Sequence, residues 1–199
     1  KMYGNRLIIV LLMLPALLLF LFFIPIPTLF LLIISLFKWD LITDPVFTGF
    51  GNYRYLFTGD FYFWNALKNN VIWLTGGMLL NLVPAFFLAL ILSRKIRGRT
   101  FFRSVIFMPS TLSSTAVSLI WYFVYHYKIG VLNQIIRIFG DKDFEYAWLL
   151  DARIALYCVM VTVAWQWTGH NMVIYLSGLA AIPDDILDAA RIDGANGWK

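Results

Sequence analysis

Apolar residues along this chain come in long blocks that contain no Asp, Glu, Lys or Arg, and not at the one-face spacing of a soluble helix. A helix that crosses a bilayer needs about 20 apolar residues, because each residue advances the chain by about 1.5 Å. The blocks also lack the in-out alternation of a membrane barrel strand. We therefore predict an all-α integral membrane protein, a polytopic helical bundle with four spans over residues 7–37, 69–93, 104–127 and 154–182.

The first apolar block follows Lys1 and Arg6, which is also how a signal peptide begins. A signal peptide has an apolar core of only about 7–15 residues and ends at small residues suited to cleavage. This block is longer and ends in Leu-Phe-Lys-Trp, so we interpret it as a retained span. The prolines at positions 15, 25 and 27 are expected to kink this helix or to mark the start of one.

A short basic loop between the second and third blocks indicates the orientation. Loops rich in Lys and Arg stay in the cytoplasm, and this loop has no acidic neighbour. Because each predicted span carries the chain to the other side of the membrane, a cytoplasmic loop here makes the N-terminus and residues 183–199 cytoplasmic as well. Residues 38–68 and 128–153 are then external. The five cations of the loop are Arg94, Lys95, Arg97, Arg99 and Arg103.

The overall composition excludes a soluble protein, since 61% of the residues are hydrophobic, 14% are charged and the mean hydropathy is +0.76. The net charge of +5 does not indicate nucleic-acid binding, because the cations gather beside the apolar blocks. The single cysteine, Cys158, can form neither an intrachain disulfide nor a clustered-thiolate metal site. We predict no metal site.

Residues after the fourth block have the pattern of a short amphipathic helix. Pro183 suits a first helical position, and the acidic pair at 184 and 185 suits the positive end of the helix dipole. Gly194 permits the left-handed conformation that ends a helix. On these grounds alone, a docking helix and a connector lying on the bilayer remain equally compatible. The residues that share one face by their spacing are Ile186, Ala189, Ala190 and Asp193.

Polar and aromatic residues cluster near the middle of the fourth block. Polar groups at that depth are costly unless they face protein or water, so they could line a substrate cavity in which the tryptophans stack on sugar rings. They could equally hold helices together, as Asn, Gln and His do in membrane proteins. We carry both interpretations. The candidate substrate-path residues are Trp165, Gln166, Trp167, His170 and Asn171.

Two smaller patterns predict helix packing. Ala85 and Ala89 have the small-xxx-small spacing of a close helix contact. The run of Ser and Thr at 110–115 follows Pro109, and its hydroxyls are expected to satisfy carbonyls freed at the proline.

The segment Asp188-Ala-Ala-Arg-Ile-Asp-Gly-Ala-Asn196, which follows an Ile-Pro, resembles the cytoplasmic signature of the permease subunits of sugar-type ABC importers. That family includes the maltose-type and glycerol-phosphate-type systems. Asp188 stands where the family usually has Glu, which shortens the acid by one methylene. The family would continue beyond Lys199 with two further spans, so we expect this chain to be incomplete. Upstream matches, in order, are Phe47 to Tyr53, Phe63 to Asn70, Arg103, Met108-Pro109, Trp121, Gly130 to Asn133, Trp148-Leu149, Trp167 to Met172 and Leu176 to Leu179.

The resemblance implies a permease that moves a carbohydrate across the bacterial inner membrane by alternating access. Its expected partners are a dimer of ABC ATPases, a sister permease, an extracytoplasmic solute-binding protein and membrane lipid. ATP and Mg would bind the partner ATPase, since no Gly here is followed by Lys and a phosphate-binding loop requires that pair. The chain itself is expected not to be an enzyme. The resemblance assigns ATPase coupling to Asp188, Ala189, Ala190, Asp193 and Gly194.

An ATP-independent secondary transporter or channel is the main alternative. Such proteins usually bury an ionisable relay within their spans, and the four blocks contain no Asp, Glu, Lys or Arg. A membrane enzyme would need clustered catalytic or ligating side chains, and the two histidines, His126 and His170, are isolated in the sequence.

Overall fold

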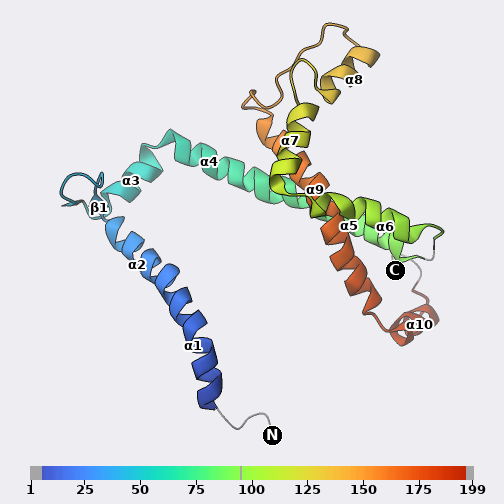
Figure 1. The fold of residues 1–199 in the computed structure, drawn as a ribbon, viewed down its shortest axis with the longest axis horizontal. Coiled ribbons are helices and arrows are strands. Elements are labelled where there is room, and N and C mark those ends of the chain that lie inside the picture. Colours follow the sequence, from blue (N-terminus) through green and yellow to red (C-terminus); the bar gives the residue numbers. More distant parts are fainter. Residues whose placement is uncertain (1–5, 95, 196–199) are drawn as a thin grey trace. The chain divides into compact units, whose positions relative to one another are not determined.

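A computed structural model describes residues 6–94 and 96–195. The chain divides into two compact units, Lys1–Leu67 and Lys68–Lys199. Figure 1 traces the elements along the chain, which is mostly helical, as predicted. The prediction that residues 1–199 form one transmembrane domain stays a prediction.

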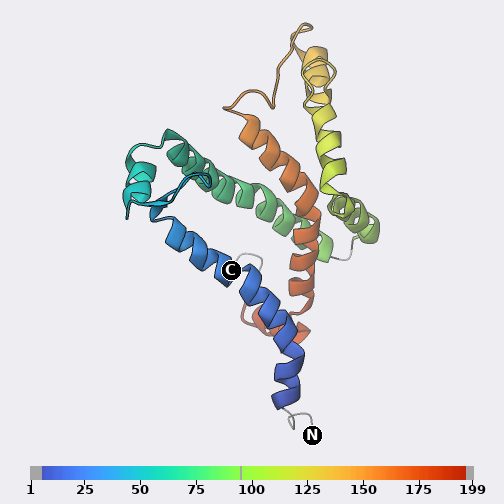
Figure 2. The ribbon, with the colours of Figure 1, turned by 60° about the vertical axis from the view of Figure 1, so that its left-hand side comes forward.

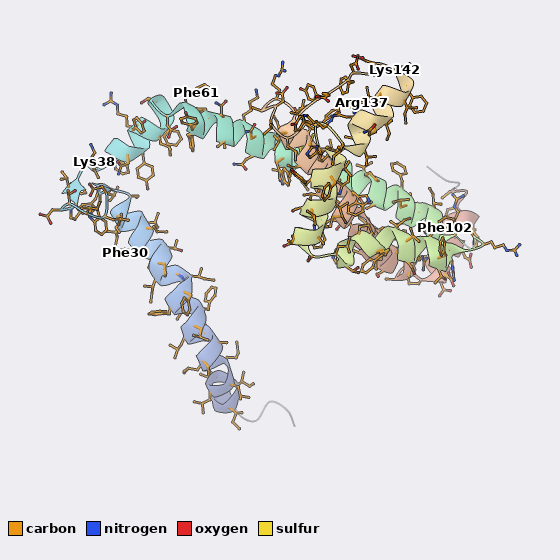
Figure 3. The ribbon with its side chains drawn as sticks, turned by 45° about the horizontal axis from the view of Figure 1, so that its top comes forward. Phe30, Lys38, Phe61, Phe102, Arg137 and Lys142 are labelled. Carbon is orange, nitrogen blue, oxygen red and sulfur yellow. The ribbon has the colours of Figure 1, made fainter. Side chains whose placement is uncertain are left out.

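The first unit begins with two consecutive apolar helices, α1 (Arg6–Phe23) and α2 (Pro25–Ile34). The helix breaks at Ile24 because Pro25 has no N–H to donate, whereas α1 continues through Pro15. Residues Ile8–Ile34 are still long and apolar enough to cross a membrane. Their side chains, such as Phe30, point outward around the helix, and none in the window is buried within the structure (Figure 3). That exposure suits lipid contact.

A small hairpin and a helix follow α2. Strands β1 (Phe37–Lys38) and β2 (Val46–Phe47) pair antiparallel, with Phe37 opposite Phe47. Helix α3 (Gly51–Thr58) comes next. The amide of Asn52 donates to the carbonyls of Ser35 and Phe37, both at 2.8 Å. These two bonds tie α3 to the end of α2, which gives Asn52 of the Phe47 to Tyr53 motif a structural role.

Helix α4 (Phe61–Ile72) runs into a π-helical turn, η1 (Trp73–Gly77), and then into α5 (Met78–Ser93). The stretch Phe61–Ser93 is the second candidate membrane span. Helix α5 crosses α9 (Ala155–Ala180), as Figures 1 and 2 show. The predicted alanine contact is confirmed, since Ala85 and Ala89 are fully buried there. They pack with Leu92, Met172 and Leu176.

The third predicted span is not one continuous helix. Helix α6 (Arg99–Phe107) leads into a 3-10 turn, η2 (Met108–Thr111), and then into α7 (Ser114–Val124), with a bend of 99° between the two helices. The break follows from Pro109, which lacks a donor. As predicted, hydroxyls in the Ser/Thr run cover carbonyls beside it: Ser110 donates to Phe107 O and Thr111 to Met108 O, both at 2.7 Å.

Helix α8 (Val131–Phe139) and the loop after it are held by one buried amide. Asn133, fully buried, donates to the carbonyls of Tyr127 and Tyr146 and accepts a bond from the Trp148 indole at 2.7 Å. The Gly130 to Asn133 motif and the Trp148-Leu149 motif are therefore in direct contact through Asn133 and Trp148. The last helix is α10 (Asp184–Ile192).

Two helices of the described residues are long and apolar enough to span a membrane, or three if the bent pair α6 and α7 counts as one span. Helix α9 has 26 residues and no ionisable Asp, Glu, Lys or Arg, but it is not among the candidates. Its polar cluster around Gln166 and Asn171 lowers its hydropathy. Four spans, as predicted, are therefore not confirmed.

Candidate functional site

Helix α10 begins one residue later than the sequence suggested. Asp184 is its first residue, and Pro183 immediately precedes it. The carbonyl of Pro183 accepts a bond from the N–H of Ile186 at 3.1 Å. Asp184 and Asp185 lie in the first turn, as expected, where the exposed N–H groups of the helix favour carboxylates.

The end of α10 follows the predicted geometry. Gly194 has φ +79°, in the left-handed region that only residues without a Cβ adopt freely. The N–H of Ala195 then donates back to Ala190 O at 2.9 Å, and the N–H of Asp193 donates to Ala189 O at 3.0 Å. This six-to-one closure satisfies carbonyls at the helix end and fixes the direction of the chain after it.

Much of the α10 surface is exposed. The side chains of Ile186 and Ile192 are 60% and 87% exposed, and Asp188, Ala189, Asp193 and Gly194 are also exposed, while Ala190 is half-buried. The five predicted coupling residues thus sit together on one short helix and its terminating turn. An exposed apolar face beside carboxylates is suited to contact another protein.

On α9, Gln166 holds two segments together. Its side chain is buried, and its amide donates to the carbonyl of Leu112 at 3.3 Å. Leu112 is extended and lies at the break between η2 and α7, where its carbonyl is outside any helix. Gln166 therefore satisfies a backbone group of the broken segment, which supports the helix-contact interpretation for this residue.

A second close contact lies one turn away. A Cβ added to Gly169 would come within 2.0 Å of the carbonyl oxygen of Ile106. The backbones of α6 and α9 therefore approach as closely as only a glycine allows. The glycine of the Trp-x-Gly motif has a packing role that the sequence alone did not reveal.

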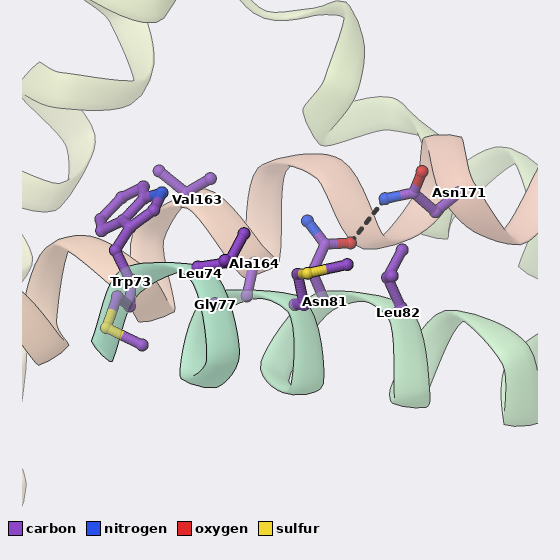
Figure 4. Close-up of a pocket in the computed structure, with 10 residues that line it drawn as sticks. Trp73, Leu74, Gly77, Asn81, Leu82, Val163, Ala164 and Asn171 are labelled. Atoms are coloured by element: carbon purple, nitrogen blue, oxygen red, sulfur yellow. Dashed lines mark hydrogen bonds between the residues drawn. The ribbon is translucent and has the colours of Figure 1, made fainter. Parts of the chain in front are cut away.

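Asn171 faces a cavity between α9 and the second apolar stretch (Figure 4). Its amide donates to the Asn81 side-chain oxygen at 2.7 Å. The cavity measures about 240 Å³, and the π-helical turn forms one wall of it. Asn81 was missed from the sequence, although a polar residue within an apolar block was a usable signal. The lining residues are Trp73, Leu74, Gly77, Met78, Asn81, Leu82, Met160, Val163, Ala164 and Asn171.

The other three candidate path residues are exposed, but they do not share one face of α9, because Trp165 and Trp167 are two residues apart on the helix. Trp165 and Trp167 are 39% and 41% exposed, and His170 is exposed as well. The Trp167 and His170 rings meet edge to face with their centroids 5.6 Å apart, and Trp165 meets Trp121 in the same way at 5.7 Å. The structure therefore distributes the five residues over several sides of α9, rather than gathering them in one pocket.

The chain matches the family described as the inner membrane component of binding-protein-dependent transport systems over residues 81–199. It is 34% identical over 196 residues to a probable ABC transporter permease of Pyrococcus horikoshii, an alignment that covers 96% of this chain and 65% of that protein. A lactose transport system permease of Rhizobium radiobacter is 34% identical over 153 residues, which are 76% of this chain and 51% of that one. The chain thus spans less than two thirds of the length of these relatives.

The fold is also similar to that of a solved structure. A chain of a bacterial ABC transporter involved in the import of the acidic polysaccharide alginate superposes with a TM-score of 0.77. The sequences are 20% identical, and the superposition covers 96% of this chain and 64% of that one.

Proposed function

The chain belongs to the family of inner membrane components of binding-protein-dependent transport systems, and on that premise we propose that it is a permease subunit of an ATP-driven carbohydrate importer. The observation that carries the proposal is α10, an exposed helix with a glycine-defined end, which three residues separate from the packed helix α9. Carbohydrate is favoured because relatives are described as permeases for lactose, for xylose and arabinose, and for starch degradation products.

In this proposal α10 docks on a separate ATPase and transmits its movement. Asp188 and Asp193 are the polar anchors, Ala189 and Ala190 allow close approach, and Gly194 directs the chain. Helix α9 is packed against α5 through Ala85 and Ala89, so a displacement of α10 would move the α5–α9 pair as a unit. ATP and Mg bind the partner ATPase dimer, which performs the hydrolysis.

The membrane arrangement belongs to the same proposal. Helix α9 has 26 residues, and at about 1.5 Å per residue it would cover the roughly 30 Å hydrocarbon core. We assign four spans, a cytoplasmic N-terminus and a cytoplasmic α10 in the bacterial inner membrane. The basic loop that includes Arg94, Arg97 and Arg99 supports this direction.

For the translocation path we assign the exposed ring side chains of α9 and the adjoining cavity. Trp165, Trp167 and His170 offer rings to a sugar, and Asn171 offers an amide oxygen at the Asn81 contact. Gln166, which lies between the two tryptophans in the sequence, holds this part of α9 in place through its bond to Leu112. A sister permease would complete the cavity, and an extracytoplasmic binding protein would deliver the substrate. A solved alginate transporter in complex with a periplasmic protein, similar in fold to this chain, supports such an assembly.

The conformation of Gly194 provides the test. Valine is strongly disfavoured at φ +79°, whereas asparagine tolerates left-handed backbone. In the full-length protein assembled with its ATPase and binding protein, we expect Gly194→Val to lower ATP-dependent uptake from a panel of mono- and disaccharides at least tenfold. Gly194→Asn should keep most of it. Unchanged uptake by the valine variant, at equal amounts in the membrane, would overturn the coupling role.

A further inference from the structure

A groove runs along the last two turns of α5 and the start of the loop that follows. Its volume is about 680 Å³. It lies beside the α9 contact: Ala85, Ala89 and Leu92 are buried against α9, while Phe87 and Ile91 are 48% and 56% exposed. The groove is lined by Phe86, Phe87, Leu90, Ile91, Ser93, Arg94 and Ile96.

The lining changes from apolar to cationic along the helix. Phe87 and Ile91 are four residues apart and stack on one face, and Arg94 follows at the helix end. From Phe87 to Arg94 the helix advances by roughly 10 Å at about 1.5 Å per residue. That length matches the upper part of an acyl chain below its headgroup. The groove therefore presents a charge at one end and an apolar channel beneath it.

No ion pair among the described side chains neutralises the positive charge at this end of the groove. The sequence has no Asp or Glu between Asp60 and Asp141. Among the side chains that the structure describes, ion pairs join Arg137 to Glu145 and Arg153 to Asp151, and neither pair includes Arg94, Arg97 or Arg99. Arg103 is directed elsewhere, because its guanidinium donates to Leu92 O at 2.6 Å.

We propose that this groove binds an anionic phospholipid, with its phosphate on Arg94 and an acyl chain against Phe87 and Ile91. Basic sites beside membrane helices hold such headgroups, and each cation near an anionic membrane surface contributes an attraction of about fivefold in affinity. A soluble phosphate would leave the apolar part of the groove unused, and a zwitterionic lipid would gain less from the uncompensated arginines. The inference rests on membership of an inner-membrane family and does not depend on which solute is carried.

The test uses the full-length protein in its assembled complex, delipidated in detergent and then titrated with phosphatidylglycerol or phosphatidylcholine. Native mass spectrometry counts the bound lipids. Wild type should prefer phosphatidylglycerol, and Arg94→Gln should reduce that preference by about fivefold. The matched control, Arg54→Gln on α3, removes the same charge from an exposed position outside the groove and should leave the preference unchanged.

A second variant tests the apolar part of the site. Ile91→Trp fills the channel from an exposed position and should reduce binding of both lipids while the complex stays assembled. Equal binding of the two lipids by wild type, or equal effects of Arg94→Gln and Arg54→Gln, would overturn the proposal. Displacement of the lipid by inorganic phosphate would identify a soluble-anion site instead. An assembled complex that excludes lipid from the groove would show that another protein segment covers it.

Discussion

Asp40 organises the loop between the two short strands. Its carboxylate accepts bonds from the N–H of Thr43 at 2.8 Å, the Thr43 hydroxyl at 2.7 Å and the N–H of Ile42 at 3.1 Å. These bonds, chiefly that from the Thr43 N–H, lower the pKa of Asp40 from 3.8 to about 2. The indole of Trp39 closes the same loop by donating to Thr43 O at 2.7 Å.

The lowered pKa predicts how this loop responds to acid. Because the folded loop favours the ionised carboxylate, its stabilising effect is complete above pH 3.8 and is lost as the pH falls towards about 2. We expect the Thr43 amide, measured by hydrogen exchange and corrected for its intrinsic rate, to lose protection in that window. Asp40→Ala should lose it at every pH, and Asp44→Ala, which leaves these bonds in place, should not. Protection that persists in Asp40→Ala would contradict the account.

At the residue scale, the sequence showed which residues belong to motifs, but it did not show which atoms those residues contact. Asn52, Asn133 and Gly169 all stood in recognisable motifs. Their partners are backbone carbonyls such as Ser35 O, Tyr146 O and Ile106 O. A backbone carbonyl has no residue-specific signal, so its partner cannot be read from a pattern. Gly194 is the opposite case, because its role depends only on its own φ and on the helix before it.

At the scale of elements, the contact between α6 and α9 depends on a single missing side chain. Gly169→Ala would force a Cβ against Ile106 O and should destabilise the protein by about 1–3 kcal/mol, as overpacking typically does. Gly178→Ala in the same helix meets open space and should be neutral or slightly stabilising. Thermal unfolding of the two variants in detergent measures the difference. Equal midpoints would mean that the close approach is not a real constraint.

The local pattern of apolar and polar residues predicted α10, α9 and the contact through Ala85 and Ala89 of α5 close to where they occur. It failed where two distant segments decide the geometry. The π-helical turn at Trp73–Gly77 alters the winding of a helix that stays continuous over Phe61–Ser93, and the 99° bend after α6 divides the third apolar block. The pairs Gln166–Leu112 and Asn171–Asn81 join residues 54 and 90 positions apart. Periodicity carries no information on such pairs, although Pro109 did mark the bend.

At the scale of the whole molecule, the direction of the chain across the membrane can be tested with single cysteines, since these 199 residues contain one cysteine, Cys158, which is buried. In a Cys158→Ala background, we expect an impermeant maleimide to label Lys142→Cys in intact cells. Arg97→Cys and Asp185→Cys should react only after permeabilisation. Labelling of positions 142 and 185 from the same side would show that α9 does not cross the membrane.

The central claim is that α10 contacts the ATPase. The most direct measurement places a cysteine at Ala189, in the full-length protein with Cys158 and any other native cysteine replaced, and attempts crosslinking to the co-expressed ATPase subunit. The account predicts a permease–ATPase product for Ala189→Cys, and none for Lys142→Cys in the loop after α8. A protein that is inserted and active in uptake, yet gives no such product at position 189, would contradict it.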